Sequence, residues 1–76
     1  MTRYFFHMHG SAHERDEDGL DLADDNAARR EAIRYGGSLL SDEPDILNRN
    51  DGLRINVVNE KGRLCFAVVI NALDVT

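Results

Sequence analysis

The chain has 76 residues, of which 42% are hydrophobic, and its formal net charge is −5. This length predicts a single domain over residues 1–76 with a small core, because so short a chain buries only about 60% of its unfolded surface. The longest apolar stretch, Leu64 to Ile70, is far below the roughly 20 residues that span a bilayer, so we expect no membrane segment. The acidic balance disfavours nucleic acid as a partner. A lone cysteine, Cys65, cannot form an internal disulfide, which favours a reducing cytoplasm.

Residues Arg3 to His9 alternate in the way that predicts a first β-strand. One face of this strand carries Tyr4, Phe6 and Met8, and the other carries Arg3, Phe5, His7 and His9. An acidic turn that ends in glycine, Asp16-Glu17-Asp18-Gly19, follows. It predicts a short second strand from Leu20 to Leu22, which we expect to pair with residues near His13.

A helix is predicted next, with Asp24 as its N-cap. Small residues recur every four positions at Ala28, Ala32 and Gly36, a stripe that would let the helix lie close to a sheet. Two interpretations of the Gly36-Gly37 pair are open, since glycine could end the helix or could let the helix pack closely on the sheet. The spacing of the leucines that follow favours continuation to about Ser41.

The end of the chain predicts a β-hairpin, because two apolar runs flank Asn59-Glu60-Lys61-Gly62. In the last strand one face carries Leu64, Phe66, Val68 and Ile70, and the other carries Cys65, Ala67 and Val69. Both faces are apolar, which is typical of a strand in the middle of a sheet.

These elements predict an α+β fold with the order β-(β)-α-β-β. We expect a three- to four-stranded, mainly antiparallel sheet with one helix packed on one face. The last strand should lie centrally, giving the order 1-4-3 for the main strands, with the Leu53 strand parallel to the first and a right-handed helical crossover between them. The order 1-3-4 is the alternative.

The face without a helix is the predicted interaction surface. An apolar centre with a polar rim is typical of association surfaces. Its expected members are Phe5, Arg54, Asn56, Val58, Cys65, Ala67 and Val69. We expect a binding module that forms a symmetric homodimer, either through this face or through an exposed edge strand.

Three histidines suggest the one alternative that involves chemistry. His7 and His9 project from the same face of a strand and could chelate a divalent metal ion, with His13, Glu14 or Asp16 completing the shell. A solvent-facing pair without a ligand is the simpler interpretation. No pattern indicates catalytic residues, and one helix on so small a sheet offers little depth for a substrate, so we expect neither an enzyme nor a cofactor.

The acidic charge is concentrated, because seven of the 14 acidic residues lie between Glu14 and Asp25. Such a segment could dock on a basic protein, as the regulatory partner of a toxin does. The simpler interpretation is a solvated loop that leads into the positive end of a helix.

Several short motifs together resemble a known family. They are Arg3-Tyr4-Phe5-Phe6-His7, Asp16-Glu17-Asp18-Gly19, Leu22-Ala23-Asp24, Ala27-Ala28-Arg29, Glu31-Ala32 and the closing hairpin with glycine at its turn. With these the chain resembles, over nearly its whole length, a family of small bacterial proteins known only as a domain of unknown function. It differs at Ala23, where proline is usual, and at Asp25, where leucine is usual. The resemblance implies the fold and carries no activity.

Overall fold

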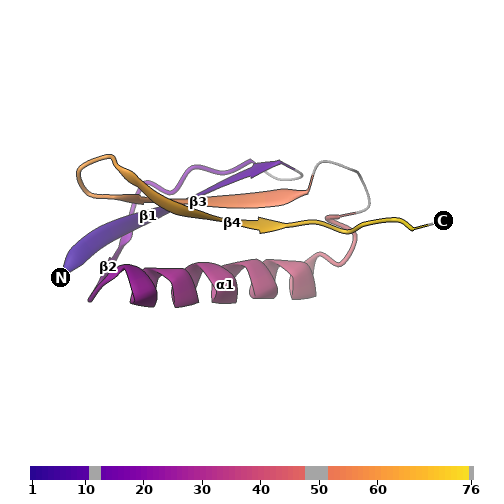
Figure 1. Ribbon diagram of the computed structural model, residues 1–76, viewed down its shortest axis with the longest axis horizontal. Coiled ribbons are helices and arrows are strands. Elements are labelled where there is room, and N and C mark those ends of the chain that lie inside the picture. The colour runs from indigo at the N-terminus through magenta and orange to yellow at the C-terminus, as the bar shows by residue number, and fades with distance from the viewer. Residues whose placement is uncertain (11–12, 48–51, 76) are drawn as a thin grey trace.

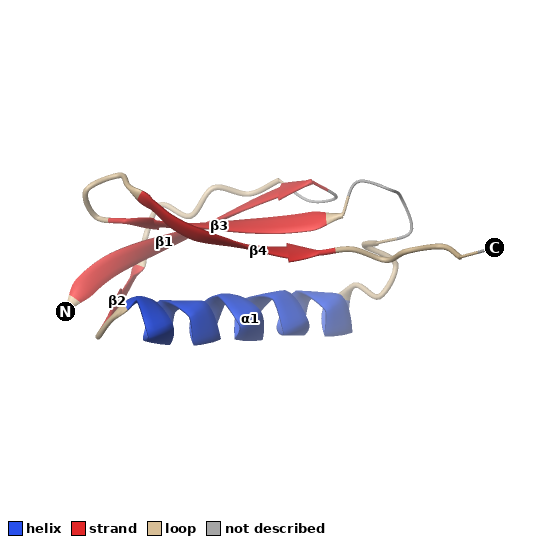
Figure 2. Ribbon diagram, in the orientation of Figure 1, coloured by secondary structure: helices blue, strands red, loops and turns tan. Residues whose placement is uncertain are grey.

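The computed structural model describes residues 1–10, 13–47 and 52–75. In chain order its elements are β1 (Thr2–Gly10), β2 (Leu20–Leu22), α1 (Asp25–Asp42), β3 (Leu53–Asn59) and β4 (Leu64–Ile70). The strands form one antiparallel sheet in the order β2-β1-β3-β4, and α1 lies across one face of it (Figures 1 and 2). This arrangement confirms the predicted α+β fold. We call the sheet face turned away from α1 the outer face.

The strand order differs from the predicted 1-4-3. The strand between β1 and β4 is β3, which pairs with β1 in antiparallel fashion from Tyr4↔Asn59 to Gly10↔Leu53. The alternative order 1-3-4 is therefore the observed one, and the predicted parallel crossover is absent from the described sheet. The physical reason is that one face of the sheet is open. Because polar side chains on the outer face remain solvated, Arg54 and Asn56 do not exclude β3 from a central position.

The short strand β2 is found where it was predicted, but its partner is different. It pairs with the start of β1, from Thr2↔Leu22 to Tyr4↔Leu20. The region of His13 instead contributes an isolated bridge between Glu14 and Met8, farther along the same edge of β1. The acidic turn therefore separates two short contacts that both lie along β1.

The helix begins as predicted, since the Asp24 carboxylate accepts a hydrogen bond of 2.9 Å from the backbone N–H of Ala27. It passes through both glycines and ends at Asp42. Gly36 is buried under the sheet, where an added Cβ would lie 3.0 Å from Cδ1 of Ile70 and 3.3 Å from Cδ1 of Ile55. The absence of a side chain at this position lets α1 approach the sheet closely, which offsets the cost of glycine in a helix.

The core lies between α1 and the sheet. Its buried side chains are Tyr4, Phe6, Met8, Ala28, Ala32, Leu53, Ile55 and Val57. The Tyr4 hydroxyl donates a hydrogen bond of 2.7 Å to Asp25, in the first turn of α1. This bond, together with burial, raises the pKa of Tyr4 to about 12. No helix in the described part of the chain is long and apolar enough to cross a membrane.

A register shift in the hairpin changes which residues of β4 face outward. Val57 lies opposite Phe66, but the next residue, Val58, lies opposite Leu64. Cys65 is the extra residue of this β-bulge, and it packs against the core cluster. The shift corrects two predicted orientations, because Cys65 leaves the outer face and Leu64 takes its place there.

Candidate interaction surface

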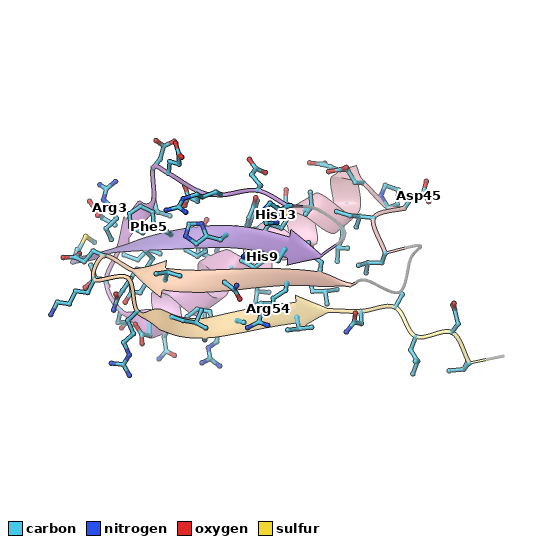
Figure 3. All side chains as sticks on the ribbon, turned by 90° about the horizontal axis from the view of Figure 1, so that it is seen from above. Arg3, Phe5, His9, His13, Asp45 and Arg54 are labelled. Carbon is cyan, nitrogen blue, oxygen red and sulfur yellow. The ribbon has the colours of Figure 1, made fainter. Side chains whose placement is uncertain are left out.

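The outer face consists of three cross-strand rows, which Figure 3 shows from above. Row by row, the paired residues on β1, β3 and β4 are Phe5–Val58–Leu64, His7–Asn56–Ala67 and His9–Arg54–Val69. The first row, beside the hairpin, is wholly apolar, and the other two mix polar and apolar side chains. All the predicted surface residues except Cys65 lie on this face. Leu64, which is 50% exposed, is the member that periodicity alone could not find.

The predicted histidine set is divided in the structure. The imidazole of His7 stacks on Phe5, with ring centroids 6.4 Å apart, and its Nδ1 accepts a hydrogen bond of 3.1 Å from the backbone N–H of Asp16. The rings of His9 and His13 lie edge to face with their centroids 5.1 Å apart. Across residues 1–10, 13–47 and 52–75, no group of three or more His, Cys, Asp or Glu side chains is placed to hold a metal ion. The structure thus brings together two of the three predicted ligands.

The edge of β1 beyond β2 is capped by the acidic segment. Met8 and Glu14 exchange two backbone hydrogen bonds, of 2.8 and 3.1 Å. Between this bridge and β2, the backbone N–H of Phe6 donates to Oδ2 of Asp16 at 3.1 Å. Oδ1 of Asp16 also accepts from the backbone N–H groups of Asp18 and Gly19. One carboxylate therefore replaces a strand where the chain bulges away from β1.

The pKa of Asp16 reflects this role. Its partial burial alone would raise the pKa, but the hydrogen bonds from Gly19, Phe6 and Asp18, together with the nearby His7, lower the pKa below its ordinary value. Gly19 has a φ of +70°, and an added Cβ would lie 2.9 Å from the carbonyl oxygen of Tyr4. The Asp-x-Asp-Gly pattern is thus a structural cap in which only glycine fits the last position.

Arg3 neutralises part of the same edge. Its guanidinium forms an ion pair of 3.1 Å with Asp21 and donates a hydrogen bond of 2.6 Å to the backbone carbonyl of Asp18. Beside the acidic segment, a hollow of about 690 Å³ opens towards α1, with Tyr35 among its lining residues. Its charged lining consists of Glu14, Arg15, Asp16, Glu17, Asp18, Glu31 and Arg34. The region stays acidic, because five carboxylates line it against two guanidinium groups, and Arg34 is already paired with Glu31 at 2.7 Å.

The opposite edge of the sheet is formed by β4 and has a different character. Residues 64–70 contain no charged residue and no proline, and within the described residues no strand lies beyond them. Val69 is 60% exposed and Leu64 is 50% exposed. An apolar edge strand of this length is usually protected by charges, by proline or by a covering segment. The bulge at Cys65 affects only one end of β4.

The direction of the backbone groups in β4 follows from the alternation of an antiparallel sheet. Met8 bonds to Glu14, so the N–H and C=O of Met8 point away from β3. The N–H and C=O of its neighbour His7 therefore point towards β3. By the same alternation, the backbone groups of Ile55 point towards β4 and those of Val68 point towards β3. The backbone groups of Ala67 and Val69 consequently point out from the free edge of the sheet.

Comparison with protein families matches residues 3–71 to the model described as Domain of unknown function (DUF6894). The chain belongs to this family. The match begins at the second residue of β1 and extends past the end of β4, so it includes the helix and all or nearly all of every strand. Searches of curated proteins and of solved structures find no match. The resemblance expected from the sequence is therefore confirmed, and the function has to be argued from the surface itself.

Proposed function

We propose that this DUF6894 protein is a small cytoplasmic binding module that works as a homodimer, with the β4 edge as its contact. The single observation that carries the proposal is the difference in protection between the two sheet edges. At the β1 edge, Asp16 and Glu14 satisfy backbone groups that would otherwise face solvent. At the β4 edge, the outward backbone groups belong to an apolar strand on which another strand can be added.

The outer face supports the same proposal. Phe5, Val58 and Leu64 form an apolar row that reaches the β4 edge, so an apolar side chain of a strand added there would pack beside Leu64. Such coverage helps a domain of this size, whose own core is small. The charges support it as well, because the acidic segment lies at the far edge of the sheet and two joined copies would keep these segments apart.

The test is light scattering on the purified chain at tens of micromolar. The wild type should have twice the chain mass of 8.6 kDa. Ala67→Pro removes an N–H that points out of the β4 edge without removing a bond to β3, so it should give a folded monomer. Asp21→Pro is the control at the opposite edge, because the pairing of Thr2 and Tyr4 with β2 turns the Asp21 N–H outward; it also removes the ion pair with Arg3. This control should remain a dimer.

Two results would contradict the proposal. A monomeric wild type at these concentrations removes the homodimer altogether. If Ala67→Pro dimerises as well as Asp21→Pro does, the contact between the two copies does not lie at the β4 edge. Far-ultraviolet circular dichroism of each variant shows whether the sheet is intact, so that loss of the dimer is separated from loss of the fold.

A basic protein partner is the second candidate, and the acidic hollow beside α1 favours it. Asp16 is already engaged by backbone groups and Asp21 by Arg3, so Glu14, Glu17 and Asp18 are the side chains offered to such a partner. An arginine-rich peptide should bind at low salt and dissociate as the ionic strength rises. Equal weak binding to a variant with Glu14 and Glu17 changed to glutamine would count against this candidate.

A further inference from the structure

We infer that two copies join β4 to β4 in an antiparallel pair whose two-fold axis passes beside Val68, so that Ala67 of each copy lies opposite Val69 of the other. This inference rests on the proposed homodimer and adds its register. A two-fold axis perpendicular to the sheet makes the same strand serve both copies and closes the assembly at two. The combined sheet would have eight strands, with the two acidic edges at its outer ends.

The backbone directions limit the choice of register. Outward N–H and C=O groups are available at Ala67 and Val69, within the regular part of β4. An axis at Val68 pairs Ala67 of one copy with Val69 of the other, and Val69 of the first with Ala67 of the second. In each pair the outward N–H and C=O groups then form two hydrogen bonds. An axis at Ala67 would instead pair Val69 with Cys65, where the bulge distorts the backbone. An axis at Val69 would pair Ala67 with Asn71, which lies beyond the strand.

The side chains agree with the same axis. On the outer face, the small side chain of Ala67 would lie opposite the larger one of Val69. On the helix side, Phe66 would lie opposite Ile70, and Val68 would lie opposite its own copy. Every pair is apolar, which is the composition that stabilises adjacent strands.

The charges at the two ends of β4 are complementary in this register. Arg63 precedes the strand, and Asp74 lies in the extended segment that follows it (Figure 1). With Cys65 left out as the extra residue of the bulge, an axis at Val68 places Arg63 of one copy near Ala72 of the other, two residues before Asp74 of that copy. The charges are therefore compatible with this register, which the backbone geometry selects.

Cysteine cross-linking tests the register directly. In a Cys65→Ser background, Val68→Cys should form a disulfide-linked dimer on oxidation, because the Cα atoms of a non-hydrogen-bonded antiparallel pair lie about 4.5 Å apart. Ala67→Cys and Val69→Cys are the matched controls. Each would lie roughly 8 Å from its own copy, beyond the about 7 Å that a disulfide can bridge, and should cross-link poorly. Native Cys65 should not cross-link either, since its copies would be about 20 Å apart.

Charge reversal supplies a second, independent measurement. Arg63→Glu should weaken dimerisation about five- to tenfold, because each dimer contains two such contacts at an exposed position. Adding Asp74→Arg should restore the affinity, whereas Asp74→Arg alone should weaken it. Equal affinity for the single and double variants would overturn the contact between Arg63 and Asp74, whereas the cross-linking decides the register.

The outcomes separate the register from the homodimer itself. If Ala67→Cys or Val69→Cys cross-links faster than Val68→Cys, the axis is wrong but the β4 contact stands. If none of the three cross-links although the wild type is dimeric and Ala67→Pro is monomeric, the pairing is not the antiparallel one inferred here. If the wild type is monomeric, the homodimer fails first.

Discussion

The two edges of the sheet show how one small chain treats the same structural problem in opposite ways. At the β1 edge the backbone amides face a carboxylate and a bridge, and the segment that supplies them is acidic. At the β4 edge the chain places an apolar strand with neither charge nor proline. An edge that is capped cannot accept another strand, whereas an uncapped apolar edge favours one. The comparison favours the β4 edge, which carries no obvious functional motif, as the place of the proposed contact.

The largest effect should come from Asp16→Ala. This change removes the acceptor of three backbone hydrogen bonds, including the one that caps Phe6. We expect a loss of about 3 kcal/mol in the free energy of unfolding, and a fall in Tm of roughly 10–20 °C. Thermal denaturation followed by circular dichroism measures it. A change of less than about 1 kcal/mol would show that the acidic segment does not protect this edge.

Gly19→Ala should have the next largest effect. The residue has a positive φ, and its new Cβ would crowd the carbonyl oxygen of Tyr4, so we expect a loss of about 2 kcal/mol. Gly62→Ala is the matched control, since Gly62 also has a positive φ but an added Cβ meets nothing within 4 Å. The difference between the two variants in urea denaturation reports the crowding alone. Equal losses would mean that the turn is not held tightly against β1.

Arg3→Ala should cost less, about 1 kcal/mol. It removes an exposed ion pair with Asp21 and a hydrogen bond to the Asp18 carbonyl, both at the capped edge. For comparison, Arg34→Ala removes an ion pair within the helix and should cost roughly 0.3–0.5 kcal/mol. Chemical denaturation of both variants at low and high salt gives the measurement, and the two losses should decrease as salt rises. If Arg34→Ala proves the more costly, Arg3 does not contribute to the cap.

The smallest effect near neutral pH, and a growing one in acid, should come from the titration of Asp16. Because folding lowers the pKa of this carboxyl, its contribution to stability is complete above the ordinary value of 3.8 and is lost as the pH falls through the lower pKa of the folded state. The Tm of the wild type should therefore fall on acidification in this range. Asp16→Asn should show a flatter profile over the same pH values, and parallel profiles would exclude the carboxylate as the cause.

Much of the fold could be predicted because local patterns report it directly. The alternation in β1, the N-cap at Asp24 and the glycine of the hairpin each depend on a few neighbouring residues. The spacing of the leucines after Gly36-Gly37 also correctly predicted that α1 passes through this pair, and a tight contact of Gly36 with Ile55 and Ile70 compensates for the glycine. The outer face followed from the same periodicity, with six of its seven predicted members in place.

The amino-acid sequence alone specifies the set of elements, the face of β1 and β3 that α1 covers, and membership of a family whose fold it shares. The neighbour of each strand, the orientation of Cys65 and Leu64, and the role of the acidic turn emerge only in the folded chain. Strand order depends on pairing between distant segments, and a sheet with one open face tolerates either an apolar or a mixed strand in its centre. One extra residue in a strand reverses the direction of the next side chain, so a bulge cannot be read from period-two alternation. Asp16 looks like any surface acid until β1 is placed beside it, because its three hydrogen-bond donors are brought to it by the fold.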